Sequence, residues 1–193
     1  MTCWRNVALL LLLFVGPSVL AAQGARDTTP VVIKLVNPAT VESLPSWLRD
    51  VLGRRGCEIP QMHSDEGLNN IHPGHFVDSV TDSYALLCSR SGQSAVLIVT
   101  KDPGLTPPPI LVRPDTSYLI MIRGGGRGTR HEFARYLTPL SSAEVQRWCP
   151  LPNAEKARAH DGIITFYQDR DPTPYYFTQT TRTWIRCGWP SPE

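Results

Sequence analysis

The stretch HFVDSVTDSYALLCSRSGQSAVLIV, residues 75–99, decides the fold. A polar loop leads into an apolar segment in which two sets of packing residues alternate, the period-two pattern of a β-strand with two covered faces. The two sets are Tyr84, Leu86 and Cys88, and Ala85 and Leu87. Ser91-Gly92-Gln93 has the residues of a tight reversal, and the apolar, β-branched run AVLIVT follows it. The stretch therefore predicts a β-hairpin with Cys88 at the end of its first strand.

The segments around this hairpin predict more strands and a few short helices. SLPSWLRDVLGRRG places Trp47, Leu48, Val51 and Leu52 on one face of a helix that begins at Pro45 or Ser46 and ends at Gly53. Ser141 and Glu144 have the spacing of a capping box, which predicts a helix over about 142–148 that Pro150 and Pro152 stop. Further strands are expected in four segments: 117–122, 162–168, 174–179 and 183–187.

Three connecting segments are expected to be irregular. NNIHPGH (69–75) has the composition of a turn-rich loop, and the proline-rich segment 101–115 predicts an extended connection across the surface. RGGGRGTR (123–130) predicts a wide glycine loop or a bulged hairpin, and the type of the following EFARYL stays open. The fold class that follows is α+β and β-rich, a mainly antiparallel sheet of hairpins with two or three short helices.

The first residues predict export. An arginine at position 5, an apolar run over residues 8–15 and the small residues of SVLAAQGA have the order of a secretory signal peptide, residues 1–21. Cleavage after Ala22 or Gly24 and a retained anchor helix are the alternatives. Residues 22–43 are expected to form an N-terminal arm, in which VVIKLV is either a first strand or an ordered tail, and residues 44–193 a single globular domain. The protein is expected to be secreted or periplasmic, with no membrane span after cleavage.

The net charge and the number of cysteines bear on the partner of the protein and on its disulfides. Loss of Arg5 with the signal peptide lowers the formal net charge from +2 to +1, which gives no reason to expect a nucleic acid partner. Cys3 is lost too, so an even set of cysteines reaches an oxidising compartment: Cys57, Cys88, Cys149 and Cys187. We favour the pairs Cys57–Cys88 and Cys149–Cys187, which staple each half of the chain. A zinc site is the alternative, although no C-x-x-C spacing is present.

Several patches resemble a set of uncharacterised secreted bacterial proteins. They are RRGCEIPQ, HFVDSVTDSYALLCSRSGQSAVLIV and HDGIITFYQDRDPTPYYFTQTTRTWIRC, which together cover parts of residues 44–187 in the same order as in those proteins. This resemblance implies no activity. Phe76, Asp78 and Asp82, before an apolar strand, are also similar to the FG-GAP type repeat of integrin-like propellers. That likeness implies a β-rich recognition module, although two carboxylates four residues apart are fewer than a calcium loop uses.

Histidines and serines offer weak catalytic patterns. His72 and His75, with His63 nearby, have the residue type for a zinc or copper site, but a Pro-Gly pair separates them and gives the rings no common face. HDGI places His160 beside Asp161, as in part of a catalytic triad; Asp161-Gly162 is also ordinary turn chemistry, with the glycine at positive φ. No G-x-S-x-G elbow accompanies it. The alternative function that follows is a metal-assisted hydrolase using His72, His75 and His160.

Arginines and aromatic residues are the candidate binding groups. Arg123, Arg127 and Arg130 surround glycines whose backbone amides could bind an anion. Aromatic residues crowd the last fifty positions, and alternation would turn Tyr167, Tyr176 and Trp184 outward as a patch for a glycan or protein. The sequence therefore predicts a non-catalytic binding or interaction module with no cofactor and an unknown extracytoplasmic protein or glycan as partner. An envelope-stress or inhibitor-like protein differs from this only in its target.

Overall fold

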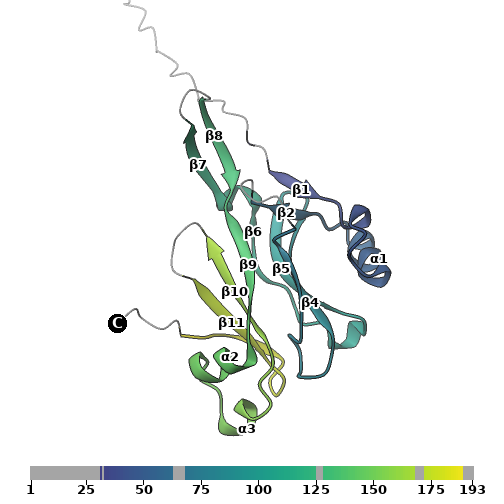
Figure 1. Cartoon of the computed structure of the whole chain (residues 1–193), viewed down its shortest axis with the longest axis vertical. Coiled ribbons are helices and arrows are strands. Elements are labelled where there is room, and N and C mark those ends of the chain that lie inside the picture. Colours follow the sequence, from purple (N-terminus) through teal and green to yellow (C-terminus); the bar gives the residue numbers. More distant parts are fainter. Residues whose placement is uncertain (1–30, 32, 63–67, 125–127, 168–171, 189–193) are drawn as a thin grey trace, which may run out of the picture.

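The computed structural model describes residues 31, 33–62, 68–124, 128–167 and 172–188. Two four-stranded antiparallel sheets form its centre, each with its strands in chain order (Figure 1). The first contains β3 (Ile71–Gly74), β4 (Ser83–Arg90), β5 (Gln93–Thr100) and β6 (Ile110–Pro114). The second contains β9 (Arg135–Leu140), β10 (Gly162–Tyr167), β11 (Thr173–Thr178) and β12 (Thr183–Arg186). The β-rich, antiparallel fold class expected from the sequence is confirmed.

Smaller elements cover the outer faces of the two sheets or extend from them. Helix α1 (Ser46–Arg54) and the strand pair β1 (Lys34–Val36) and β2 (Ile59–Gln61) lie beside the first sheet, and α2 (Ser142–Trp148) and α3 (Asn153–Lys156) beside the second (Figure 1). A hairpin of β7 (Leu119–Gly124) and β8 (Gly128–Phe133) projects from the body. Three 3-10 turns complete the described elements: Pro38–Thr40, Pro103–Leu105 and Asp115–Tyr118.

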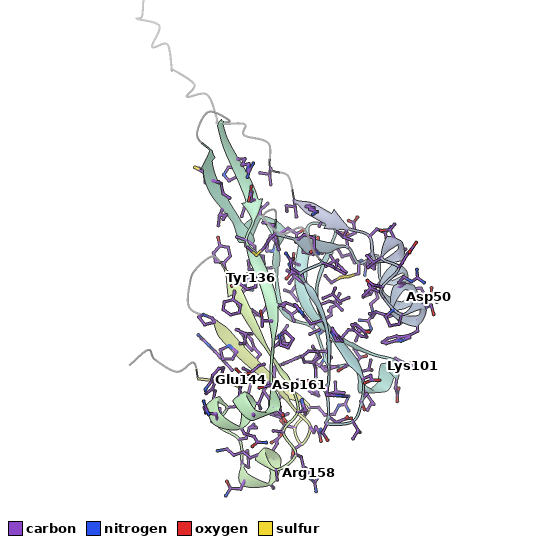
Figure 2. All side chains as sticks on the ribbon, viewed as in Figure 1. Asp50, Lys101, Tyr136, Glu144, Arg158 and Asp161 are labelled. Atoms are coloured by element: carbon purple, nitrogen blue, oxygen red, sulfur yellow. A yellow bond between two sulfur atoms is a disulfide. The ribbon has the colours of Figure 1, made fainter. Side chains whose placement is uncertain are left out.

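Among the described residues, the core consists of three apolar clusters. The two alternating sets of residues in β4 belong to two different clusters. Leu86 and Cys88 pack with α1 and β2, whereas Ala85 and Leu87 pack between the two sheets. Figure 2 shows the side chains that fill this space. A third cluster, which contains Val145 of α2, lies under the second sheet. Because α1 and the second sheet cover opposite faces of β4, its period-two pattern is apolar on both sides.

The predicted hairpin of β4 and β5 is present, with a two-residue loop. Arg90 pairs with Gln93, and the loop residues Ser91 and Gly92 have φ values of 51° and 76°. Positive φ at both loop positions is the geometry whose twist matches that of paired strands. The reversal predicted from Ser91-Gly92-Gln93 is therefore the tightest that a hairpin allows.

The disulfides attach each outer helix to its sheet. Cys57 follows α1 and bonds to Cys88 of β4, and Cys149 follows α2 and bonds to Cys187 after β12. These are the two pairs favoured from the sequence. All four cysteines lie inside the apolar clusters on the helix side of the sheets, so each bond also fills part of a core.

Both predicted helices are present. The elements predicted around several prolines were wrong. Ser141 and Glu144 form the expected capping box of α2. Pro152, expected only to stop this helix, is the N-cap of α3. The expected loop 69–75 contains β3 and the expected proline connection contains β6. Pro73 and Pro114 fit in these strands because both are edge strands, where a missing backbone N–H breaks no ladder.

The sequence left the structure of the VVIKLV and glycine segments and of EFARYL open. The VVIKLV segment contributes the first strand, β1, which pairs with β2. The first and last residues of the glycine segment lie in the paired strands β7 and β8, and most of EFARYL lies at the end of β8 and the start of β9. The predicted signal peptide, residues 1–21, lies outside the described residues. Among the described helices, none has the length and apolar character to cross a membrane.

Candidate functional site

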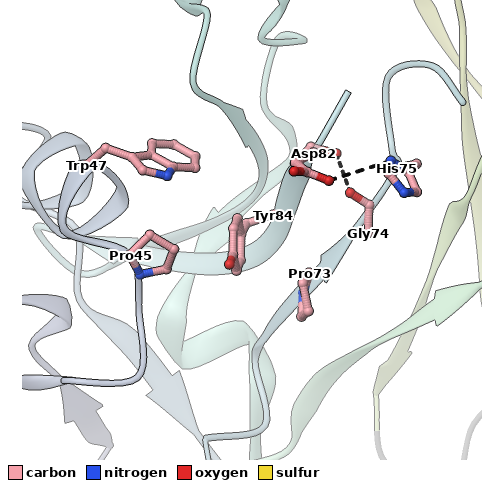
Figure 3. A pocket seen from close by; sticks show the side chains of 8 residues that line it. Pro45, Trp47, Pro73, Gly74, His75, Asp82 and Tyr84 are labelled. Atoms are coloured by element: carbon pink, nitrogen blue, oxygen red, sulfur yellow. Dashed lines mark hydrogen bonds and ion pairs between the residues drawn. The ribbon is translucent and has the colours of Figure 1, made fainter. Parts of the chain in front are cut away.

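An open cleft of about 460 Å³ lies between α1 and the β3–β4 edge of the first sheet (Figure 3). Trp47, in the first turn of α1, and Tyr84 of β4 form its aromatic wall, with ring centroids 6.0 Å apart and ring planes at 68°. Pro45 and Pro73 add apolar surface beside these rings. Both aromatic residues are half-buried, so each packs against the core and still presents part of its ring to solvent. The Trp47–Tyr84 cleft, as we call it, thus has an apolar wall that packs against the core.

A histidine and a carboxylate occupy the polar end of this cleft. His75 Nδ1 lies 4.0 Å from Asp82 Oδ1, and the two side chains are 45% and 95% exposed. His75 Nδ1 is also 3.4 Å from the Thr81 carbonyl oxygen. Water screens so exposed a pair, so the contact with Asp82 does not hold the imidazole in one orientation.

Ser83 lies beside this pair, and its contacts decide whether the three residues form a catalytic triad. The Ser83 hydroxyl donates to the Gly74 carbonyl oxygen at 3.0 Å and accepts from the Phe76 amide at 2.8 Å. The hydroxyl proton therefore bonds to the backbone rather than to an imidazole, and Ser83 is almost fully buried. A nucleophilic serine must donate its hydroxyl hydrogen bond to the general base, which removes the proton during attack. These contacts make Ser83 a clamp that holds the chain between β3 and β4.

The structure does not bring the predicted metal-binding histidines together. His72 Nε2 lies 2.9 Å from the Leu137 carbonyl oxygen, toward the second sheet, whereas His75 faces the cleft. His160 is buried, with Nδ1 2.9 Å from the Asp161 carbonyl oxygen, and His63 lies outside the described residues. Within the described ranges no three histidine, cysteine or acidic side chains form a metal-binding group. The hydrolase alternative therefore has no ligand set among the described residues, because its three histidines have separate surroundings.

Asp161 connects the cleft to the second sheet. Its carboxylate accepts a hydrogen bond from the His75 amide at 3.0 Å, and its own amide donates to the His75 carbonyl oxygen at 2.9 Å. The carboxylate therefore does not orient the adjacent His160 ring. The Asp161 side chain was predicted to accept a hydrogen bond from a backbone amide, and it does. The amide, however, belongs to His75, which is distant in sequence, and not to the local turn.

The glycine prediction at the same motif was wrong. Gly162 is not among the described residues with positive φ. Instead, a Cβ at Gly162 would lie 2.7 Å from the Tyr175 carbonyl oxygen, so close packing of β10 on β11 requires the glycine.

Asp78, part of the FG-GAP likeness, closes a turn. Its carboxylate accepts from the Val80 amide at 2.9 Å and from the Thr81 hydroxyl at 2.7 Å. Burial alone would raise the pKa of Asp78, but the hydrogen bonds from Thr81 and Val80 outweigh it and lower the pKa. Asp82 faces the Trp47–Tyr84 cleft, so the two carboxylates have separate roles.

The outward aromatic patch predicted near the C-terminus was partly wrong. Tyr176 is fully buried in the cluster under α2, whereas its neighbour Tyr175 packs between the sheets. Alternation cannot separate inside from outside here because helices cover the face that would otherwise meet solvent. Trp184 is half-buried, and its indole N–H donates to the Pro108 carbonyl oxygen at 3.0 Å. It therefore holds the proline-rich connection.

The predicted arginine group is divided along the β7–β8 hairpin. Arg123 is in β7 and Arg130 in β8, whereas Arg127 lies outside the described residues. The exposed Arg130 forms an ion pair with Glu132, which reduces its charge available for an anion. The anion site remains a prediction at these residues.

Two buried polar centres were not predicted. The Asn70 side chain donates to the Pro60 and Arg135 carbonyl oxygens and accepts from the Leu137 amide at 3.0 Å. Asp115 accepts hydrogen bonds from the hydroxyls of Ser89 and Ser94. In sequence, Asn70 lies in an Asn-Asn pair typical of a turn, and the two serines resemble surface positions of a hairpin. Nothing local indicated that these groups are buried.

The fold and this geometry define the protein as a disulfide-stapled β-rich domain with an open aromatic cleft. Comparison of the chain with protein-family models, with curated proteins and with solved structures finds no match. The conclusions on function below therefore rest on the described residues.

Proposed function

We propose that this protein is a non-catalytic binding module that acts outside the cytoplasm and holds an extended, proline-containing segment of another protein in the Trp47–Tyr84 cleft. The observation that carries the proposal is the pair of half-buried aromatic rings, from two different elements, that share one open cleft. Exposed apolar surface of this kind, rimmed by polar residues, is typical of an interaction site.

The shape and composition of the cleft favour an extended proline-containing ligand. Polyproline segments have no internal hydrogen bonds, and they dock on aromatic-lined grooves because little conformational entropy is lost. Trp47 and Tyr84 supply such a wall, and Pro45 and Pro73 lie beside it. The exposed carboxylate of Asp82 at the polar end suits a basic side chain next to the prolines.

The contacts of the polar residues in the cleft support binding rather than catalysis, and the disulfides support a location outside the cytoplasm. Ser83 uses its hydroxyl for backbone bonds, and the His75–Asp82 pair is too exposed to act as an oriented base. Two disulfides are typical of proteins in oxidising compartments and are rare in the cytosol.

The test is a titration followed by two-dimensional NMR of the disulfide-intact protein. The probes are a synthetic peptide of ten prolines and the same peptide with one terminal arginine. We expect saturable shifts of the Trp47 indole signal with both peptides. Asp82→Asn should weaken binding of the arginine peptide several-fold and leave the all-proline peptide unaffected, because only the charge contact is lost.

Asp50→Asn is the matched control, because Asp50 is an exposed carboxylate on α1 outside this cleft (Figure 2). It should change neither affinity. Shifts confined to residues outside the cleft, or no saturable shift with either peptide, would contradict the proposal. A glycan that displaces the peptides from Trp47 would keep the site and change the ligand class.

A further inference from the structure

A second cleft, of about 280 Å³, lies at the other end of the molecule, between α3 and the turn that follows β11. Tyr176 and Glu155 line it, and Arg158, Gln179 and Thr180 lie exposed around it. Arg158 is labelled beside α3 in Figure 2. This Tyr176–Glu155 cleft shares no lining residue with the Trp47–Tyr84 cleft.

Tyr176 contributes a buried hydroxyl to this cleft. The residue is 0% exposed, its ring stacks on His160 with centroids 4.4 Å apart, and its hydroxyl has no hydrogen-bond partner of normal geometry among the described residues. Burial, and after it the charge of Glu155, raises the pKa of Tyr176 to about 12, while the His160 backbone amide near the oxygen opposes this shift. The hydroxyl therefore keeps its proton, and that proton has no acceptor among the described residues.

Glu155 contributes the complementary atom. Its Oε1 is also buried without a hydrogen-bond partner in the described part of the chain. Buried polar atoms are almost always paired in folded proteins, so a free donor and a free acceptor on two residues that line one cleft point to a ligand group that pairs with both.

The chemistry of that group follows from what each atom needs. An anion would accept from Tyr176 but would be repelled by the Glu155 carboxylate. An ammonium group would donate to Glu155 but would leave the Tyr176 proton without an acceptor. A hydroxyl group accepts and donates at once, so it can satisfy both atoms.

We propose that the Tyr176–Glu155 cleft binds a saccharide or similar small polyol, with one ligand hydroxyl accepting from Tyr176 and donating to Glu155. The side chains of Arg158, Gln179 and Thr180 around the cleft supply donors and acceptors for further hydroxyls. The volume of the cleft suits a ligand of about one sugar ring. This proposal is independent of the function assigned to the Trp47–Tyr84 cleft.

The test is a two-dimensional NMR titration of the full disulfide-bonded protein with five hydroxylated probes: glycerol and the methyl glycosides of glucose, galactose, mannose and N-acetylglucosamine. Sodium acetate and ethylammonium chloride are the anionic and cationic controls. We expect at least one hydroxylated probe to give saturable shifts at Tyr176, Gln179 and Thr180, and neither control to do so. No saturable shift with any of the five, or equal shifts with a control, would overturn the proposal.

Tyr176→Phe removes only the hydroxyl and should weaken binding of the probe at least ten-fold. Tyr84→Phe, in the other cleft, is the matched control and should leave it unchanged. Without ligand, Tyr176→Phe should not lower the Tm, because the hydroxyl has no partner of normal geometry among the described residues to lose. A clear fall in Tm, or unchanged affinity in this variant, would show that the hydroxyl is already satisfied and would overturn the proposal.

Discussion

His75 and Asp161 exchange two hydrogen bonds across the two sheets, although they are 86 positions apart in the chain. The His75 amide donates to the Asp161 carboxylate and the Asp161 amide to the His75 carbonyl oxygen, at 3.0 and 2.9 Å. The same histidine lines the Trp47–Tyr84 cleft. The second sheet therefore fixes the backbone at the polar end of a cleft that is built from the first.

Asp161→Ala should lower the free energy of unfolding by about 1–2 kcal/mol, because the half-buried His75 amide loses its acceptor. Asp161→Asn keeps an oxygen acceptor and should cost less. Urea denaturation followed by circular dichroism measures both. Equal losses in the two variants would show that the charge, rather than the hydrogen bond, stabilises this contact.

Asn70→Ala should destabilise the protein by about 3 kcal/mol, because it leaves two backbone carbonyls and one amide unpaired inside the core. Gln146→Ala, at an exposed position of α2, is the control and should change stability little. The measurement is the shift of the urea midpoint at constant slope. A loss no larger than that of the control would mean that water replaces the Asn70 side chain.

Removal of either disulfide should lower stability by about 4 kcal/mol on the loop-entropy account, because the closed loops of 31 and 38 residues are of similar length. The variants are Cys57→Ala with Cys88→Ala, and Cys149→Ala with Cys187→Ala. Thermal unfolding of each pair variant tests the size of the effect. Mass spectrometry of the unreduced parent should find four hydrogens fewer than in the reduced chain, and free thiols in that sample would contradict the pairing.

Acid should destabilise the protein through His160. Burial lowers the pKa of this imidazole, although the Asp161 carbonyl and the charges of Asp78 and Asp161 oppose the shift. The unfolded chain therefore binds the proton first, so the contribution of His160 is present above its ordinary pKa of about 6.5 and is lost as the pH falls through its lower folded value.

The measurement is the free energy of unfolding in urea at pH 7.5, 6.5, 5.5 and 4.5. His160→Phe keeps a ring against Tyr176 and removes the titrating group, so its stability should fall less over this range than that of the parent. His72→Phe is unsuitable as a control, because the His72 ring bonds to the Leu137 carbonyl oxygen. The control is Lys156→Met, which changes a charge on α3. Parallel pH profiles for the parent and His160→Phe would refute this origin of acid sensitivity.

Much of the fold was predictable because its signals are local. The alternation of Leu86 and Leu87, the reversal at Ser91-Gly92 and the capping box of Ser141 with Glu144 each involve neighbours in the chain. The edge strands β3 and β6 were missed because Pro73 and Pro114 argue against a strand unless its edge position is known.

Most of the candidate sites depend on contacts that no local pattern encodes. Tyr176 was expected outside because its neighbours alternate, and only the packing of α2 and α3 on that face buries it. Likewise, nothing in the chain places Trp47 beside Tyr84 or Glu155 near Tyr176.

By itself, the sequence determined the antiparallel β-rich class, the main hairpin, both longer helices and an even set of cysteines that suits two disulfides. Those features follow from backbone periodicity, capping and turn chemistry over a few residues. The tertiary structure alone decided where Asn70, Ser83, His75 and Tyr176 bond or remain unpaired. The reason is physical: burial and hydrogen bonding of a side chain depend on which distant element covers it, and that is settled only when the sheets and helices pack together.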